Sequence, residues 1–272
     1  MTLLVVKVGG GFGIEYEALC EDIKELKSQG TQLILVHGGS AKTNTLSCEL
    51  GKPPRFVTSV SGYESRYTDR EAMDIFIMAC AALNREITMD LQRRGVNAVG
   101  LCGIDGGLLK GRRKDTLKIV EDGRKKVLRG DHSGTLDEVN GHLLSTLLEA
   151  GYLPVIGPPG LSHDGQPINV DGDRMAAALA IHAMADTLII LTNTPGVLRD
   201  VEDEGSRVSE IPYERLSELN DLAQGRMRMK LLAVEEALAS GVGTVVIGDA
   251  RREKPLSDAQ GSMGTTIKGR GV

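Results

Sequence analysis

The chain has 272 residues, of which 41% are hydrophobic and 25% charged, a composition typical of a folded globular protein rather than a disordered one. A net charge of −5 and an aromatic content of only 3% argue against a general nucleic-acid-binding protein, which presents basic and aromatic surfaces. No apolar run reaches the ~18 residues that a membrane-spanning helix needs, so we expect neither a membrane protein nor a nucleic-acid partner.

The four cysteines point to a reducing compartment. They lie far apart in the sequence, none belongs to a C-x-x-C pair, and Cys20 and Cys80 fall in apolar, helix-like patterns. We therefore expect isolated buried thiols in a cytoplasmic protein, rather than disulfides or metal ligands.

In the first part of the chain, strand and helix patterns alternate and glycines separate them. Short apolar runs predict strands, and apolar residues at helical spacing predict helices. In chain order we expect strand 3–8, helix 15–29, strand 32–37, helix 41–50, helix 70–94 and strand 96–101. Asp69 would cap the long helix, whose apolar face carries Ile75, Met78 and Ala82. This order predicts right-handed βαβ units on a parallel sheet.

The pattern changes between residues 116 and 129, where two short strand patterns flank Asp122 and Gly123, as is typical of a β-hairpin. Beyond it we expect helix 136–150, strand 153–156, helix 173–185, strand 187–192, a charged excursion over 199–222, helix 223–240 and strand 244–247. No repeat or flexible linker divides the chain, so a boundary between two lobes would fall near residues 170–180.

Three glycine turns, at 9–11, 38–39 and 103–107, directly follow predicted strands. The carboxyl ends of parallel strands meet at one edge of a sheet, where glycine N–H groups and helix N-termini bind phosphate oxygens. The G-x-x-x-x-G-K-[ST] motif is absent, and G-x-G-x-x-G does not follow the first strand, so P-loop and Rossmann sites are not indicated. Taken singly, each turn is more often a simple connection than a ligand site.

Three charged positions favour a phosphate site. Lys7 interrupts an apolar strand just before the first glycine turn, where a lysine has to be paired or face a ligand. Asp173 starts an alanine-rich helix, and it either caps that helix or orients lysines or a metal ion at a phosphate. Residues 225–230 place basic side chains, Lys230 among them, at the positive end of a predicted helix, and a bound anion would relieve that conflict.

Seven sequence blocks, in order over the whole chain, resemble the amino-acid kinase family, and within it the acetylglutamate kinase branch. They are residues 6–10, 36–39, 66–69, 100–106, 169–173, 191–197 and 225–230. The resemblance implies a three-layer α/β sandwich with a mainly parallel central sheet. It also implies an amino-acid-substrate lobe with the dimer interface over 1–175, a nucleotide-binding lobe over 176–272, and ATP-dependent phosphorylation of a carboxylate to an acyl phosphate.

The resemblance carries site roles onto individual residues. Lys7 and Lys230 would stabilise charge on the transferring phosphoryl group, and Asp173 would hold both lysines in place. The amino-acid substrate would be bound by Gly38, Gly39, Arg66 and Asn169. ATP, acting with Mg²⁺, would be bound by Gly9, Gly10, Thr192, Asn193, Gly196, Val197, Leu198, Gly225 and Met227. No protein side chain is expected to hold a metal, and no general base is needed because the attacking carboxylate is already ionised.

Within the branch, residues 62–69 and 130–135 are similar to kinases that act on α-aminoadipate or glutamate attached to a small acidic amino-group carrier protein. Ser40, Tyr67 and Asp171 stand where acetylglutamate kinases usually have glycine, valine and asparagine. The similarity implies a role in lysine biosynthesis, with arginine biosynthesis as a further role. The alternative is an acetylglutamate kinase that uses free N-acetylglutamate for arginine biosynthesis.

The charge distribution favours a macromolecular partner independently of any family. Residues 110–129 sum to +6, whereas the rest of the chain sums to −11. The side chains that we expect to dock the acidic carrier protein are Arg112, Arg113, Lys114, Lys118, Arg124, Lys125, Lys126 and Arg129. A merely solvated charged hairpin is the alternative, and nucleic acid fits less well because aromatic residues are scarce.

The sequence begins directly at its first predicted strand. Arginine-inhibited acetylglutamate kinases carry an additional N-terminal helix that links dimers into hexamers. By that resemblance we expect a plain homodimer without arginine feedback.

Overall fold

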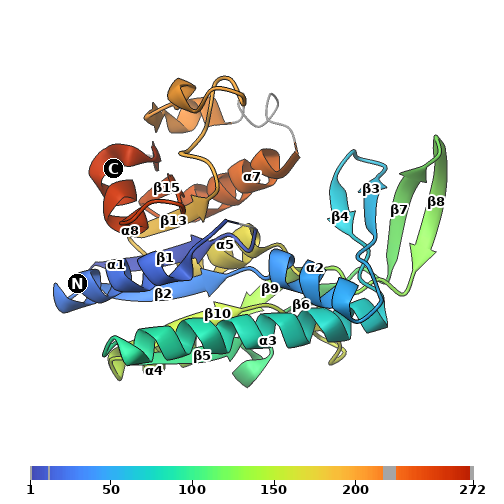
Figure 1. Ribbon diagram of the computed structural model, residues 1–272, viewed down its shortest axis with the longest axis horizontal. Helices are drawn as coiled ribbons and strands as arrows, with labels where there is room; N and C mark the ends of the chain where they lie inside the picture. Colours follow the sequence, from blue (N-terminus) through green and yellow to red (C-terminus); the bar gives the residue numbers. More distant parts are fainter. Residues whose placement is uncertain (1, 12, 217–224, 270–272) are drawn as a thin grey trace.

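The computed structural model describes residues 2–11, 13–216 and 225–269 (Figure 1). Its centre is an eight-stranded sheet that is parallel from β15 to β5, while β16 joins β15 antiparallel. In spatial order its strands are β14 (Glu210–Ile211), β16 (Thr265–Lys268), β15 (Thr244–Asp249), β13 (Thr187–Thr192), β1 (Leu3–Val8), β2 (Gln32–His37), β10 (Leu153–Gly157) and β5 (Ala98–Cys102). The predicted mainly parallel sheet is confirmed.

Helices cover both faces of this sheet, which gives the three layers that the family resemblance implied. One layer holds α1 (Tyr16–Ser28), α3 (Arg70–Arg93) and α8 (Pro255–Asp258), and the other holds α4 (Gly141–Glu149), α5 (Gly172–His182) and α7 (Gly225–Ala239). Leu4 and Val6 of β1 pack in the first layer, whereas Leu3 and Val5 pack in the second. Because side chains alternate along a strand, Lys7 is directed toward the layer of α5 and α7.

Two four-stranded sheets extend beyond the central one. The first contains, in order, β12 (Pro167–Ile168), β11 (Gly160–Ser162), β6 (Leu109–Arg113) and β9 (Gly134–Val139). The second, here called the projecting sheet, contains β4 (Glu64–Arg66), β3 (Phe56–Ser59), β7 (Thr116–Glu121) and β8 (Arg124–Arg129), and it stands at the right of Figure 1. The predicted hairpin is confirmed as β7 and β8, with Asp122 and Gly123 at the positive φ angles of 51° and 72° that a two-residue hairpin turn requires.

The helix predicted over 136–150 is wrong in its first part. Residues 134–139 form β9, which pairs antiparallel with β6, and α4 begins only at Gly141. Asn140 caps that helix, since its Oδ1 accepts a hydrogen bond from the N–H of Leu143 at 3.1 Å. The charged excursion predicted over 199–222 contains β14 and two short 3₁₀ turns, and its last residues, with 223 and 224, lie outside the described ranges.

The long helix is confirmed as α3, and Asp69 caps it by accepting the N–H of Ala72 at 2.9 Å. Its predicted apolar face is only partly right. Ile75 is buried, but Met78 is 50% exposed and Ala82 is exposed as well. The spacing was correct for a helix, yet these two residues lie on the side that turns away from the sheet.

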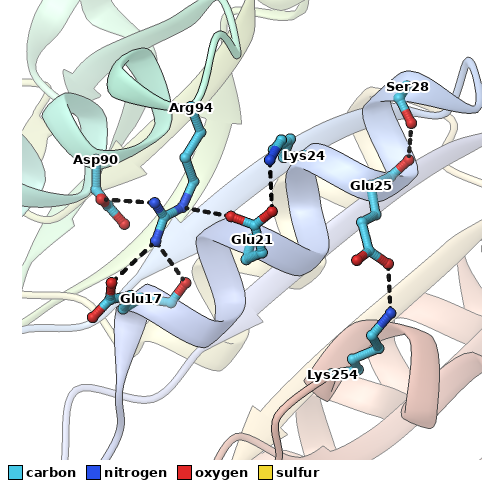
Figure 2. Close-up of polar contacts among 8 residues, drawn as sticks. All are labelled: Glu17, Glu21, Lys24, Glu25, Ser28, Asp90, Arg94 and Lys254. Atoms are coloured by element: carbon cyan, nitrogen blue, oxygen red, sulfur yellow. Dashed lines mark hydrogen bonds and ion pairs between the residues drawn. The ribbon is translucent and has the colours of Figure 1, made fainter.

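Helix α1 contacts elements of both predicted lobes (Figure 2). The guanidinium of Arg94, which follows α3, lies 3.5 Å from a carboxylate oxygen of Glu17 and 3.4 Å from one of Glu21. Further along α1, Glu25 pairs with Lys254 at 2.7 Å, next to α8. Since β1 also pairs with β13, the two predicted lobes share one sheet and one helix layer.

The cysteines are all free thiols. Cys20 and Cys80 are buried as predicted, whereas Cys48 is exposed and Cys102 is partly exposed. None of the helices that the structure describes combines the length and the apolar character needed to cross a bilayer.

Candidate active site

At the carboxyl end of β1, three charged side chains from distant parts of the chain form what we call the Lys–Asp–Lys cluster: Lys7, Asp173 and Lys230. Lys7 Nζ lies 2.6 Å from Asp173 Oδ1, and Lys230 Nζ lies 2.7 Å from Asp173 Oδ2. The side chains are only 8%, 6% and 11% exposed. The structure therefore brings together the three residues that were predicted to be catalytic, from β1, α5 and α7.

The sequence left open whether Asp173 caps α5. Asp171 is the cap, because its Oδ1 accepts hydrogen bonds from the N–H groups of Asp173 and Arg174, both at 3.0 Å. This leaves both oxygens of the Asp173 carboxylate for the two lysines.

Two ammonium groups share one buried carboxylate in this cluster. Burial opposes ionisation of Asp173, but the charges of Lys7 and Lys230 hold the pKa of that carboxyl well below its usual range. Burial lowers the pKa of Lys230, the Lys7 ammonium lowers it further, and the Asp173 carboxylate opposes both effects. With both lysines protonated, the cluster has one positive charge in excess, which a phosphate oxygen can neutralise.

Just beyond Lys7, the first two glycine turns pack backbone against backbone. A side chain at Gly10 would place its Cβ 2.5 Å from the nitrogen of Gly39 and 2.8 Å from that of Ser40. The N–H of Ala41 donates to the carbonyl of Gly10 at 2.7 Å and the N–H of Gly38 to that of Val8 at 3.2 Å. Such an approach excludes any Cβ, so a glycine is required at position 10.

The N–H groups of Gly39 and Ser40 stand at the N-terminus of α2 (Ser40–Glu49). Neither N–H group donates a hydrogen bond to an acceptor among the described residues. Unpaired N–H groups at a helix N-terminus bind phosphate or carboxylate oxygens. The third glycine turn differs, because the N–H groups of Gly103 and Gly107 donate to the carbonyls of Gly157 and Ile104, so it is a connection.

The predicted substrate residues Arg66 and Asn169 are linked through Thr68, which sequence reasoning missed. The Thr68 hydroxyl donates to the carbonyl of Arg66 at 3.2 Å and accepts from Asn169 Nδ2 at 3.1 Å. The guanidinium of Arg66 donates to the side-chain oxygen of Asn44 and lies 5.2 Å from the centre of the Phe56 ring. Arg66 is thus held at the edge of the projecting sheet, next to α2.

A fully buried carboxylate fixes this region. Asp131 Oδ1 accepts the N–H of Thr68 at 3.0 Å, and its Oδ2 accepts the N–H of Ser133 at 2.9 Å. The N–H of Asn169 donates to the carbonyl of His132 at 2.7 Å. Residues 130–135, on which the subgroup resemblance depended, therefore hold the backbone of Thr68 and Asn169 in place through these hydrogen bonds.

The predicted nucleotide residues follow the carboxyl end of β13, the strand beside β1. The N–H of Gly9 donates to the carbonyl of Leu191 at 3.0 Å, so the first glycine turn touches this segment. Gly196 has a φ of 148°, and the next N–H, of Val197, donates to the buried hydroxyl of Thr265 at 2.9 Å. Of the remaining predicted nucleotide residues, Thr192 is buried at the end of β13 and Asn193 is exposed. Leu198 forms a β-bridge with Arg207, and Gly225 and Met227 stand at the start of α7.

Two contacts beside these segments were not predicted. At the end of β15, next to Thr192, the guanidinium of Arg251 makes two 2.8 Å hydrogen bonds to Asp249 and lies 2.9 Å from Glu204. The guanidinium of Arg228 in α7 lies 5.4 Å from the centre of the Tyr63 ring, in the turn between β3 and β4. The sequence offered a signal only for the first of these contacts: an aspartate and an arginine two residues apart, at 249 and 251, after the last core strand.

Five of the eight predicted docking residues lie on the projecting sheet and divide between its two faces, whereas Arg112 and Arg113 belong to β6 and Lys114 to the link between β6 and β7. Directly paired residues of antiparallel strands share a face. The registers of its four strands therefore place Lys118, Lys125 and Arg129 on the face that carries Arg66, here called the Arg66 face. Val120 and Val127, 39% and 56% exposed, lie on that face too. The opposite face carries Arg124 and Lys126.

Several docking residues are engaged within the chain. Arg112 pairs with Asp137 at 3.1 Å, Arg113 with Asp115 at 3.1 Å, and Lys126 with Glu121 at 2.6 Å. No ion pair to another described residue is found for Lys114, Lys118, Arg124, Lys125 and Arg129. The charge that is free for a partner is thus concentrated on β7 and β8.

Comparisons with known proteins agree with this geometry. Residues 2–249 match the Amino acid kinase family. The chain is 52% identical, over 268 residues, to the "[LysW]-aminoadipate kinase" of Deinococcus radiodurans, covering 98% of this chain and 92% of the relative. It is 49% identical to the protein of the same name from Thermus thermophilus, over 98% and 100% of the two chains. Among solved structures, an N-acetylglutamate synthase from Neisseria gonorrhoeae has the same fold, with a TM-score of 0.80 at 23% identity over 100% of this chain and 60% of the other.

Proposed function

The chain belongs to the amino acid kinase family, and we propose that it transfers the γ-phosphoryl group of ATP to the side-chain carboxylate of α-aminoadipate carried on LysW, the carrier named for its relatives. The product is an acyl phosphate, formed for lysine biosynthesis. The observation that carries the proposal is the buried Lys–Asp–Lys cluster beside two contacting glycine turns. The free thiols are compatible with a cytoplasmic location.

In this reaction a carboxylate oxygen bonds to the γ-phosphorus, and the bond from that phosphorus to the bridging oxygen of ADP breaks. Negative charge is spread over the phosphoryl oxygens in the transition state, so catalysis rests on positioning and electrostatic stabilisation. Lys7 and Lys230 supply positive charge from two directions, and Asp173 keeps both ammonium groups in place. The N–H groups at Gly39 and Ser40 are further donors.

Mg²⁺ is proposed to enter with the nucleotide. Both Asp173 oxygens are occupied by lysines, and within the described part of the chain no group of three His, Cys, Asp or Glu side chains is placed to hold a metal ion. This donor set fits an ion that would be held mainly by phosphate oxygens and water and would neutralise charge on the phosphates.

We assign the substrate to the lobe of residues 1–175 and the nucleotide to that of residues 176–272. Arg66 would form a bidentate pair with the α-carboxylate of the aminoadipate residue, and Asn169, linked to it through Thr68, would hydrogen-bond the substrate together with Gly38 and Gly39. The acidic carrier would bind to the Arg66 face, where basic side chains without an ion-pair partner in the described part of the chain lie beside exposed valines.

The function is tested by trapping the acyl phosphate with hydroxylamine in the presence of ATP and Mg²⁺. We expect turnover with aminoadipate on the carrier and little with free N-acetyl-aminoadipate or free N-acetylglutamate. Turnover of glutamate on the same carrier would add a role in arginine biosynthesis. Efficient use of free N-acetylglutamate, with none of a carrier-linked substrate, would contradict the proposal.

We also propose a homodimer formed through α3. Met78 and Met89, 50% and 62% exposed, lie on its outward side together with Ala82. We expect the wild type to sediment as two chains and the Met78→Glu/Met89→Glu variant as one, because a buried charge disrupts an apolar interface. Met184→Glu, at a position 87% exposed in another part of the protein, should leave the mass unchanged. A wild type of one-chain mass at every concentration would refute this interface.

A further inference from the structure

Behind the second glycine turn lies a buried histidine that the assigned site roles do not use. His37 ends β2 and has no exposed surface. Its Nδ1 lies 2.8 Å from the carbonyl oxygen of Gly38, and its Nε2 lies 3.0 Å from Nδ2 of Asn84 in α3. The ring leaves no room for a side chain at Gly157, whose Cβ would come within 2.5 Å of it. The imidazole is therefore fixed on three sides.

These contacts define the protonation state of the ring. A carbonyl oxygen only accepts, so Nδ1 must carry the hydrogen that it donates to Gly38. The Asn84 amide nitrogen also lies 2.9 Å from the carbonyl of Val155 and 3.2 Å from that of Leu101, so this atom is the NH₂ group and can only donate toward Nε2. Its two hydrogens are assigned to the two shortest contacts, Val155 and Nε2 at 2.9 and 3.0 Å. Burial lowers the pKa of His37 to about 4, so the ring is neutral near pH 7 and Nε2 is free to accept.

The bond to Gly38 sets the direction of the next N–H. In a trans peptide the carbonyl and the following N–H point in opposite directions, so a Gly38 carbonyl held toward His37 turns the Gly39 N–H away from the ring. Gly10 packs closely against this peptide, since a Cβ added there would lie 2.5 Å from the Gly39 nitrogen. Both residues of this peptide are glycines, whose backbone dihedrals are the least restricted, so the bond to His37 adds a constraint on its orientation to those from Gly10 and Val8.

We propose that His37, oriented by Asn84, is a positioning residue that locks the Gly38–Gly39 peptide so that its N–H faces the transferring phosphoryl group. This inference rests on the proposed kinase function. The His37 imidazole lies on the α3 side of the central sheet, opposite the Lys–Asp–Lys cluster. In this role it contacts neither substrate directly.

Two substitutions separate positioning from packing. In His37→Asn the amide nitrogen takes the place of Nδ1 and keeps a donor toward Gly38, although the side chain leaves a cavity. In His37→Gln the amide nitrogen takes the place of Nε2, so the volume is better filled but the bond to Gly38 is lost. We expect kcat to fall about 10- to 100-fold in His37→Gln and to stay within about fivefold in His37→Asn, while the thermal unfolding midpoint falls more in His37→Asn.

If His37 positions the Gly38–Gly39 peptide, His37→Gln has the lower kcat of the two variants and His37→Asn has the lower unfolding midpoint. A kcat that follows the unfolding midpoint, or equal kcat values in both variants, would overturn the proposal. A second measurement needs neither turnover nor a variant that folds poorly: imidazole nitrogen NMR of the wild type should show His37 as the neutral Nδ1–H tautomer. An Nε2–H tautomer or a protonated ring near pH 7 would overturn it too, whether or not the enzyme turns over carrier-linked aminoadipate.

Discussion

Replacing Asp173 with asparagine is expected to lower kcat by about 100- to 1,000-fold while KM for ATP and for the amino-acid substrate changes little. The amide has no charge to balance Lys7 and Lys230, whose ammonium groups lie 2.6 and 2.7 Å from the present carboxylate. Without that carboxylate the two buried ammonium groups repel each other, so they move apart or one loses its proton. Steady-state kinetics with hydroxylamine trapping gives both constants.

The pH dependence distinguishes lost charge from simple disorder. Asp173 raises the pKa of Lys230 against burial and Lys7, so its removal lowers that pKa further. Since Lys230 acts as an ammonium, the fall of kcat at high pH should begin at a lower pH in the variant. Asp171→Asn is the control, because asparagine also caps a helix, so its kcat should stay within about threefold of the wild type. Asp171 raises the pKa of Lys230 less than Asp173 does, so the high-pH fall of kcat should move less in this control than in Asp173→Asn. If the pH at which kcat begins to fall at high pH is the same in Asp173→Asn and in the wild type, the proposed effect of Asp173 on Lys230 is contradicted.

The local pattern of the sequence predicted the six strands from β15 to β5 because they are apolar runs, three of them followed by glycine turns, but it did not predict β14 and β16 of the same sheet. The same pattern placed Lys7 correctly, since a lysine within a buried strand stands out from its neighbours. It failed for β3, β4 and β6, which are short and partly exposed and depend on partners far along the chain. The β3 pairing with β7, for example, joins Thr58 to Val120. Strands that depend on such distant partners need not show an alternating hydrophobic pattern in their own sequence.

Within the site, the residue types were predictable and their partners were not. Asp171 and Asp173 both stand at the start of one helix, and only the tertiary structure shows that Asp171 caps it while Asp173 meets two lysines. His37 appeared only as part of a glycine block, because its partner Asn84 comes from a helix 47 residues further along. The residues that position a reactive group are contributed by distant elements, so spacing in the sequence does not reveal them.

Reversing two charges on the Arg66 face, in Lys125→Glu/Arg129→Glu, is expected to raise KM for carrier-linked aminoadipate by about 10- to 100-fold at low salt, with little change in kcat. Neither side chain has an ion-pair partner among the described residues, so the mutation breaks no ion pair there. The acidic carrier would then meet negative charge next to exposed Val120 and Val127. Initial rates against carrier concentration measure the effect.

The β8 strand supplies its own control, because alternate residues face opposite sides. Arg124→Glu/Lys126→Glu makes the same change in net charge on the other face, so a general loss of attraction would affect both variants equally. We expect KM to rise much less in that variant, and the difference between the two to shrink as salt screens the charges. The kcat/KM for a free N-acetylated substrate should be the same in both, since a small substrate would meet Arg66 of β4 but not the charges on β8. Equal KM values for the carrier in the two variants would mean that the charge of the hairpin, and not the Arg66 face, governs docking.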